Sequence, residues 1–392
     1  MDFLNMDHFK RSRLLHLCLA ITFFASGIIV NIIQAIFYFT LRPWNKHLYR
    51  KINYFLCYTI YAQVVFVAEW WASTKLLLYI DKNDWEKYYG KEHGYCIMNH
   101  SYEIDWLMGW MACEKMKVLG NCKAYAKKSI QYLPVLGWGW KFAEFVFLER
   151  SFEKDKLVIS KQITELADHP DPMWLLLFPE GTRFTEKKHI VSLEFAKKNN
   201  LPELKHHLLP RTKGFVGSLP SMRNKIPAIY DTVIAFNPND SVEPTITNLL
   251  MAKPITAHMY IKRIPLEEVP ESISGQEQFL IDMFLRKDRL KDSFFRTGDF
   301  FTESGVDRVK PWPSQRRICV LLNMIFWLVC ILIPSFYYLM KLLFSGKFLY
   351  FSIGFSFILV FYVLLKKAIS MTDIKSSSSS YGIDGHPSKK LN

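Results

Sequence analysis

The chain has 392 residues, a net charge of +14 and 50% hydrophobic residues. By length alone it would suit roughly two or three soluble domains. Three long runs, however, contain no Asp, Glu, Lys or Arg: Leu14–Leu41, Ile318–Met340 and Phe348–Leu365. These runs exclude a simple soluble protein and a disordered chain. The long polar stretch between them excludes a polytopic transporter.

Residues 1–74 are predicted to form an N-terminal membrane-anchoring segment. Leu14–Leu41 is long enough for one tilted span, since a hydrocarbon core needs about 20 apolar residues as a helix. It is also long enough for a bent pair of helices that enters one leaflet and returns, with the bend near Gly27 and Asn31. Ile52–Ala68 is apolar but contains polar residues, which indicates either an interfacial segment or one packed against the first.

Residues 316–367 are predicted to form a C-terminal transmembrane hairpin of two helices, 318–340 and 348–365, joined by a tight link. A polar tail, 368–392, follows. It finishes in Lys389–Asn392, which resembles the dilysine KKxx signal for retrieval to the endoplasmic reticulum by coat machinery. That signal works on a cytosolic tail, so it implies a multi-pass endoplasmic-reticulum protein whose middle region faces the cytosol. A chance basic terminus is the alternative.

The middle region, residues 75–315, alternates short apolar runs with amphipathic stretches. The predicted strands are Gly94–Met98, Glu144–Leu148, Trp174–Phe178, Ile226–Phe236 and Ile255–Ile264. The predicted helices are Ser101–Met116, Ser151–His169, Ile190–Asn200 and Gly275–Leu290. This order predicts an α/β domain with a mixed, mostly parallel sheet flanked by helices. In such sheets the site lies beyond the carboxyl ends of the strands.

A histidine follows the strand Gly94–Met98 directly, in the sequence Asn99-His100, and Asp105 lies five residues further on. Five residues turn a regular helix by about 140°, so the two side chains cannot share a helix face. His100 must therefore lie at or before the helix N-terminus, with Asp105 reaching back to it. The carboxylate would fix the imidazole tautomer and leave the other ring nitrogen as a base. A chance H-x4-D among eleven histidines is the alternative.

Three further segments join a strand or an apolar run to a basic residue: Phe145–Arg150, Phe178–Arg183 and Leu209–Gly214. In the second, a turn with glycine brings Arg183 to the carboxyl end of a strand, where its planar fork would match a phosphate. The alternative is an ordinary turn with a surface ion pair.

These segments, in this order, resemble the glycerolipid acyltransferase family. Its N-H-x4-D block is met by Asn99, His100 and Asp105, and its F-P-E-G-T-R block by Phe178–Arg183. Its G-x-I/V-F-I/V-x-R block is met except that Glu144 replaces the glycine. Looser matches are the Pro block at Leu208–Pro210 and a lysine segment at Ala126–Ser129. Residues 182–189 and 204–215, together with the C-terminal hairpin, are similar to the gamma/delta subgroup of 1-acylglycerol-3-phosphate acyltransferases.

The resemblance implies transfer of an acyl group from acyl-CoA to the sn-2 hydroxyl of 1-acyl-glycerol-3-phosphate (lysophosphatidic acid), giving phosphatidic acid and CoA. His100 would be the general base, oriented by Asp105. The thioester is already activated, so acyl-CoA is a co-substrate and no metal or other cofactor is expected. The implied substrate-binding residues are Asn99, Lys127, Lys128, Arg150, Glu180, Gly181, Thr182 and Arg183. Glu180 would either position the glycerol hydroxyl or brace a cation.

The stretch from Glu186 to Lys213 holds seven Lys and Arg against three Glu. Both substrates and the lipid bilayer surface are anionic, so this charge suits them, although a solvated basic face is the alternative. Nucleic acid is not an expected partner. Two other functions stay open. One is the same chemistry on another lysophospholipid, such as lysophosphatidylinositol. The other is a non-catalytic membrane-remodelling scaffold that retains the fold.

Overall fold

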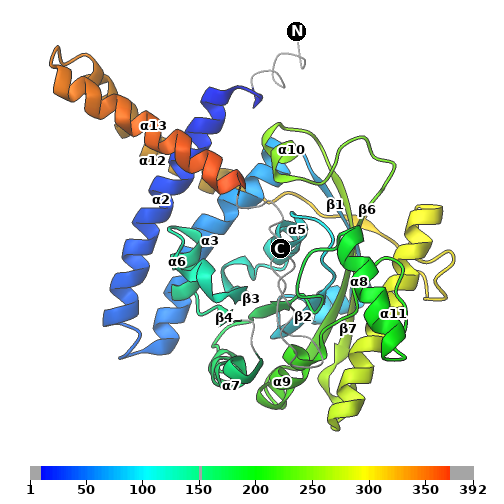
Figure 1. Ribbon diagram of the computed structural model, residues 1–392. Coiled ribbons are helices and arrows are strands. Elements are labelled where there is room, and N and C mark those ends of the chain that lie inside the picture. Colours follow the sequence, from blue (N-terminus) through cyan, green and yellow to red (C-terminus); the bar gives the residue numbers. More distant parts are fainter. Residues whose placement is uncertain (1–9, 150–151, 371–392) are drawn as a thin grey trace.

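The computed structural model describes residues 10–149 and 152–370 (Figure 1). The strands are β1 (Lys75–Tyr79), β2 (Gly94–Met98), β3 (Cys122–Lys127), β4 (Val146–Leu148), β5 (Trp174–Leu177), β6 (Ala228–Phe236), β7 (Thr256–Pro265) and β8 (Trp312–Pro313). The helices are α2 (Arg13–Thr40), α3 (Lys46–Phe66), α4 (Lys82–Lys87), α5 (Asp105–Lys115), α6 (Leu136–Phe142), α7 (Phe152–Ala167), α8 (Glu186–Lys198), α9 (Thr212–Met222), α10 (Ile246–Leu250), α11 (Ile273–Thr297), α12 (Ile318–Leu343) and α13 (Phe348–Ser370).

The strands form one sheet in the order β4-β3-β5-β2-β6-β7-β1-β8. The five strands from β4 to β6 run parallel. β7 is antiparallel to β6, β1 is parallel to β7, and β8 is antiparallel to β1. The predicted mixed, mostly parallel sheet is therefore confirmed. Its central strand β2 pairs with β5 on one side and with β6 on the other.

Helices cover both faces of the sheet. On one face the core includes Ile159 and Ile163 of α7, Phe215 of α9 and Phe284 of α11. On the other face α5 packs against the sheet and α3 packs against α5, and Met108 of α5 belongs to a second core cluster. Burial on both sides explains why the central strands are apolar runs without alternation.

Several predicted elements have different limits in the structure. The helix after β2 begins at Asp105 rather than Ser101, because residues 101–104 form a turn. α11 continues past Leu290 to Thr297 and ends at Gly298, whose φ of 77° closes the helix. β1, β3 and α9 were not predicted. β3 carries Lys123 and Lys127, so its sequence does not form an apolar run.

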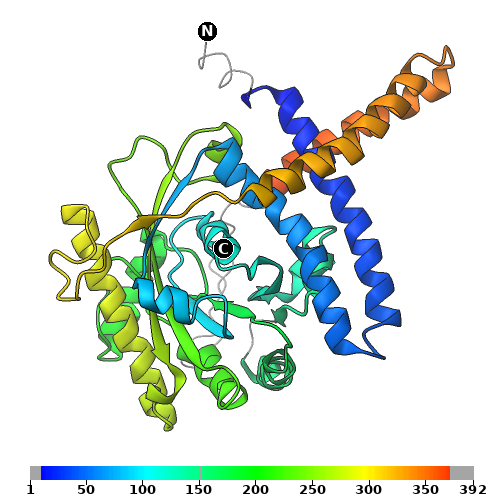
Figure 2. The ribbon, with the colours of Figure 1, turned by 180° about the vertical axis from the view of Figure 1, so that it is seen from behind.

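The apolar run 14–41 forms one continuous helix, α2, and the chain returns along it as α3 (Figures 1 and 2). Gly27 is not a bend. It lies against α6, where a Cβ atom would come within 2.3 Å of Val135 Cγ1. The glycine therefore allows a close approach between two elements.

Polar side chains between α2 and α3 bond to one another. Gln34 donates to Asn53 Oδ1 at 2.8 Å, and Gln63 donates to Ser26 Oγ at 2.9 Å. These residues interrupt the apolar pattern of both helices. Their contacts across the helix pair explain how they are accommodated in apolar surroundings.

α12 and α13 form a second helical pair that projects from the body of the protein (Figures 1 and 2). α12 contacts both α2 and α3, so the two apolar ends of the chain pack together. By length and composition α2, Lys46–Trp71 and α12 could each cross a membrane, and a shorter apolar stretch lies at Phe348–Val360. The dilysine sequence Lys389–Asn392 lies outside the described residues.

Candidate active site

The register of the parallel strands brings the two strongest sequence motifs together. Ile97 of β2 lies opposite Leu177 of β5, so both strands end at the same edge of the sheet. His100 follows the first strand and Phe178–Arg183 follows the second. Segments about 80 residues apart in sequence therefore meet at one place.

His100 and Asp105 have the arrangement that their spacing predicts. His100 precedes α5, and Asp105 in the first turn accepts a hydrogen bond from His100 Nδ1 through Oδ2 at 3.1 Å. The same oxygen accepts the backbone N–H groups of Ser101, at 2.6 Å, and Tyr102, at 2.8 Å. Asp105 is fully buried, so its carboxylate fixes the turn as well as the imidazole. Asp105 contacts Nδ1, so the other ring nitrogen of His100, Nε2, is the one that can serve as a base.

The imidazole is also held from the strand-β5 side. Phe178 stacks on the His100 ring with centroids 4.2 Å apart. The His100 carbonyl accepts a hydrogen bond from the N–H of Phe184 at 2.8 Å. Ring and backbone are thus both fixed by the segment that carries the F-P-E-G-T-R sequence, which limits the orientations of the base.

Glu180 contacts the backbone of two loops through its carboxylate. Its Oε1 accepts the N–H of His100 at 2.7 Å, and its Oε2 accepts the N–H of Leu208 at 3.0 Å. The residue is buried, and burial raises the pKa of its carboxyl group to about 7. Glu180 therefore joins three loops through their backbones.

Asn99 lies in the interior. Its amide donates to the carbonyl of Ile234 at 3.0 Å and accepts the N–H of the same residue at 2.8 Å. The side chain is fully buried. It continues the pairing of β2 with β6 and does not line the cavity that opens at His100.

A cavity of about 420 Å³ opens at His100. Gly181, with a φ of 71°, and Thr182 line it beside Lys127, Arg183 and Arg211, and the buried Lys123 lines it as well. A side chain at Gly181 would press on Arg211, whose Nε is 3.2 Å from the position of a Cβ atom. Thr182 Oγ1 accepts a hydrogen bond from Lys188 Nζ at 2.6 Å.

Arg211 was not among the predicted site residues, although it belongs to the fourth motif. Its N–H donates to the carbonyl of Pro179 at 2.9 Å, which joins that motif to the F-P-E-G-T-R turn. Arg183 lies 3.8 Å from Glu103 in an ion pair. The structure thus gathers cations from the end of β3, the loop after β5 and the start of α9 along one cavity.

The other predicted basic residues lie elsewhere. Lys128 pairs with Glu149 at 2.5 Å and lines a second cavity, between β4 and α7, that does not include His100. Arg150 lies outside the described residues. Of the two neighbouring lysines, Lys127 is the one on the cavity of His100.

Glu144 stands where the G-x-I/V-F-I/V-x-R block has glycine, and its backbone has a conformation that suits glycine. Its φ is 60°, in the left-handed region that glycine adopts without strain. The carboxylate pairs with Arg42 at 3.0 Å and with the buried Arg50 at 2.7 Å. These ion pairs hold a turn that glycine would form unaided.

Away from His100 the lining of the cavity, apart from Lys123, is mostly apolar and comes from α5 and from strands of the sheet. Its apolar lining includes Met98, Gly109, Ala112, Met116, Ala124, Leu176, Met259 and Ile261. The cavity therefore joins a polar, basic mouth to a long apolar interior.

The chain matches known proteins over nearly its full length. The Acyltransferase family model matches residues 80–227, and the Acyltransferase C-terminus model matches residues 248–327. The chain belongs to the acyltransferase family. The human 1-acyl-sn-glycerol-3-phosphate acyltransferase delta is 39% identical over 386 residues, which is 98% of either chain. The human gamma protein is 37% identical over 373 residues, 95% of this chain and 96% of its own.

This acyltransferase also aligns with the crystal structure of the 1-acyl-sn-glycerophosphate acyltransferase of Thermotoga maritima, over 72% of this chain and 98% of that one, at 14% identity and a TM-score of 0.41. The family expected from the motifs is confirmed by the sequence matches, and the protein is an enzyme of this family.

Proposed function

We propose that the protein transfers an acyl group from acyl-CoA to the sn-2 hydroxyl of 1-acyl-glycerol-3-phosphate, giving phosphatidic acid and CoA. One observation carries the proposal: the His100–Asp105 pair lies where a basic mouth meets a long apolar cavity. The delta and gamma acyltransferases named above support the acceptor.

In the proposed reaction His100 Nε2 accepts the proton of the sn-2 hydroxyl as the oxygen attacks the thioester carbonyl. Asp105 stabilises the imidazolium that forms, because its carboxylate faces Nδ1. The tetrahedral intermediate collapses with loss of the CoA thiolate, which receives the proton from His100. General base catalysis of this kind contributes about 10²–10⁴-fold. The thioester is already activated, so no metal or organic cofactor is needed.

The two halves of the cavity suit the two kinds of substrate group. Lys127, Arg183 and Arg211 at the mouth would bind the phosphate of the acceptor. The apolar interior along α5 would hold an acyl chain beside the thioester carbonyl. Gly181 and Thr182 form the turn between the two halves of the cavity. Glu180 fixes the backbone of His100 by accepting its N–H.

The experiment is acyl transfer by the purified full-length protein in detergent or nanodiscs, followed as CoA release from oleoyl-CoA with lysophosphatidic acid. His100→Ala is expected to lower kcat by about 10³-fold or more, and Asp105→Asn by about 10²-fold or more. Activity that survives in His100→Ala would sink the proposal. A panel of lysophospholipids tests the alternative acceptors.

A non-catalytic scaffold is the competing function. The packing of Phe178 and Asp105 around His100 argues for chemistry, since a scaffold has no use for a fixed imidazole at a cavity mouth. Rescue of a knockout phenotype by His100→Ala, at wild-type protein levels, would favour the scaffold instead.

We also propose residence in the endoplasmic-reticulum membrane with the catalytic region in the cytosol. The dilysine sequence at Lys389 and Lys390 supports this placement. Replacing both lysines with alanine is expected to shift the protein out of the endoplasmic reticulum in fluorescence microscopy. An unchanged distribution would remove this support.

A further inference from the structure

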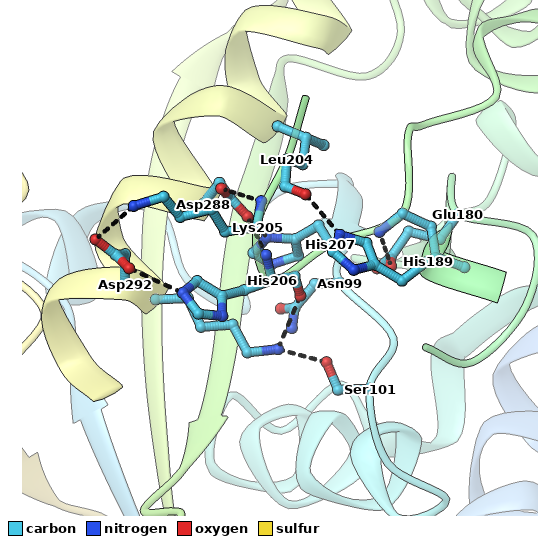
Figure 3. Close-up of polar contacts among 12 residues, drawn as sticks. Asn99, Ser101, Glu180, His189, Leu204, Lys205, His206, His207, Asp288 and Asp292 are labelled. Atoms are coloured by element: carbon cyan, nitrogen blue, oxygen red, sulfur yellow. Dashed lines mark hydrogen bonds and ion pairs between the residues drawn. The ribbon is translucent and has the colours of Figure 1, made fainter. Parts of the chain in front are cut away.

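A buried ammonium group lies beneath the turn that carries His100. Lys291, on α11, is only 3% exposed. Its Nζ donates to Ser101 Oγ at 2.5 Å and to the carbonyl of His206 at 3.4 Å (Figure 3). Ser101 is the residue next to His100. Lys291 comes from the segment matched by the Acyltransferase C-terminus model, outside the segment that contains the motifs.

Two buried carboxylates face this ammonium group. Asp105 is fully buried and Glu180 is 2% exposed. Both attract Lys291 electrostatically, as does Asp288 one turn earlier on α11. Burial lowers the pKa of the Lys291 ammonium, and these three carboxylates oppose that effect. Asp105 Oδ1 is buried and has no hydrogen-bond partner among the described residues, so its charge needs compensation at a distance.

A neutral histidine beside two buried carboxylates requires a cation close by. A cation beside buried carboxylates stabilises their charged forms, and its own charge opposes the uptake of a further proton nearby. A protonated His100 cannot accept the substrate proton. The cation that Lys291 supplies would therefore leave His100 in its basic form.

The other charged groups packed around Lys291 have partners of their own. Lys287, one turn earlier, pairs with Asp231 and donates to the Ile97 carbonyl at 3.0 Å. His206 Nε2 lies 3.0 Å from Asp292 Oδ1 (Figure 3).

Asp288 accepts the backbone N–H groups of Lys205, at 2.7 Å, and His206, at 2.8 Å. It also contacts His207 Nδ1 at 2.9 Å. Burial lowers the pKa of His207 to about 4, so at neutral pH this imidazole adds no positive charge. Asp288 therefore fixes the loop that presents the His206 carbonyl to Lys291.

We propose that Lys291 is a positioning residue of the acyltransferase: it anchors the turn after His100 and stabilises Asp105 and Glu180 as carboxylates, so that His100 remains a neutral base. The inference rests on the proposed role of His100. It adds a part of the site that is supplied by α11.

The first experiment is the pH profile of kcat/KM for Lys291→Met and Lys291→Gln. Loss of the charge favours protonation of His100 and Glu180, so the acidic limb is expected to move to higher pH by about one unit or more. The loss of kcat/KM would then be about tenfold greater at pH 6.5 than at pH 8.5. A uniform loss at every pH, or no loss, would overturn the proposal.

Ser101→Ala separates the anchor from the charge. It removes the hydrogen bond but keeps the ammonium group, so kcat is expected to fall several-fold with the acidic limb in place. Lys262→Met, at an exposed lysine of β7, is the matched control and should leave rate and profile unchanged. Thermal unfolding establishes which variants are folded. If Lys291→Met does not fold, the pH profile of Lys291→Gln tests the proposal, because glutamine retains a hydrogen-bond donor near Ser101.

A second measurement needs no turnover. Diethylpyrocarbonate modifies neutral imidazoles, and mass spectrometry reports the extent at His100 separately from the other histidines. In Lys291→Gln the midpoint of this modification against pH is expected to lie about one unit higher than in wild type. An unchanged midpoint overturns the inference. If the wild-type protein transferred no acyl group, only the proposed function would be refuted. The modification of His100 against pH would still test the role of Lys291.

Discussion

At the scale of single residues, Glu180 shows how a motif carboxylate can act through backbones. It accepts N–H groups from His100 and Leu208, which lie about 108 residues apart in sequence, and it does so from a buried position. An ionised carboxylate accepts both bonds best. In the F-P-E-G-T-R sequence the glutamate thus fixes the backbone on which His100 lies.

Glu180→Gln is expected to change the pH dependence of stability. The pKa of Glu180 rises from 4.5 to about 7 on folding, so the folded state binds more protons than the unfolded state between those values. The contribution of this group is therefore present below pH 4.5 and is lost as pH rises to about 7, on the order of 3 kcal/mol. Thermal unfolding at pH 5 and pH 8 should show a smaller decline for Glu180→Gln than for wild type.

The exposed Glu194→Gln on α8 is the matched control for that experiment and should follow wild type at both pH values. Because glutamine can accept only one of the two N–H groups, Glu180→Gln should also lower kcat by about 10- to 100-fold at pH 7.5. Equal declines in stability for all three proteins would contradict the role of Glu180.

Glu144 allows a test of backbone strain against ion pairing. Both Glu144→Ala and Glu144→Gly lose the pair with the buried Arg50, at a cost of about 3–5 kcal/mol. The φ of 60° suits glycine, so the glycine variant should be about 1 kcal/mol more stable than the alanine variant. Thermal unfolding midpoints check both the loss and the order. A glycine variant as stable as wild type would show that the pairs contribute nothing.

At the scale of elements, α5 both presents Asp105 and forms one wall of the apolar cavity. Gly109 lies four residues after Asp105, about 6 Å along the helix axis, and faces the cavity. A larger side chain at Gly109 would fill the part of the cavity that lies beyond the first turn of α5. The helix itself would gain, because most side chains favour a helix over glycine.

Gly109→Leu is therefore expected to lower kcat/KM for oleoyl-CoA at least tenfold and to leave octanoyl-CoA within about twofold. Gly109→Ala is the matched control. Its Cβ atom would lie 3.7 Å from Met98 Cε, an ordinary contact, so its chain-length profile should match wild type. Equal loss with both donors in Gly109→Leu would place the acyl chain elsewhere.

At the scale of the whole molecule, two helical pairs flank the catalytic region in sequence and pack against each other in space. If the α12–α13 pair enters and leaves the membrane, and the α2–α3 pair lies along the catalytic region without crossing, the polar segments before α2 and after α13 lie on the same side as that region. The turn between α2 and α3 carries ion pairs of Arg42 and Lys46 with Glu165 of α7, which ties the first pair to the catalytic region.

Epitope tags placed before Arg13 and after Ser370 are accordingly expected to be accessible from the same side as an epitope in the exposed loop at Asn239. Antibody labelling after selective permeabilisation of the plasma membrane measures this. A tag before Arg13 that stays protected would show that α2 crosses the membrane without a return through α3.

The sequence by itself determined the local chemistry: His100 before a helix, Asp105 reaching back, and the F-P-E-G-T-R turn at a strand end. Those features depend on spacing within a few residues, which helix and strand geometry fix. The tertiary structure decided the partners of Glu180, the course of the run 14–41, and the arrival of Arg211 and Lys291 at the site. Strand order and helix packing set these contacts between residues far apart in the chain, and no local pattern encodes them.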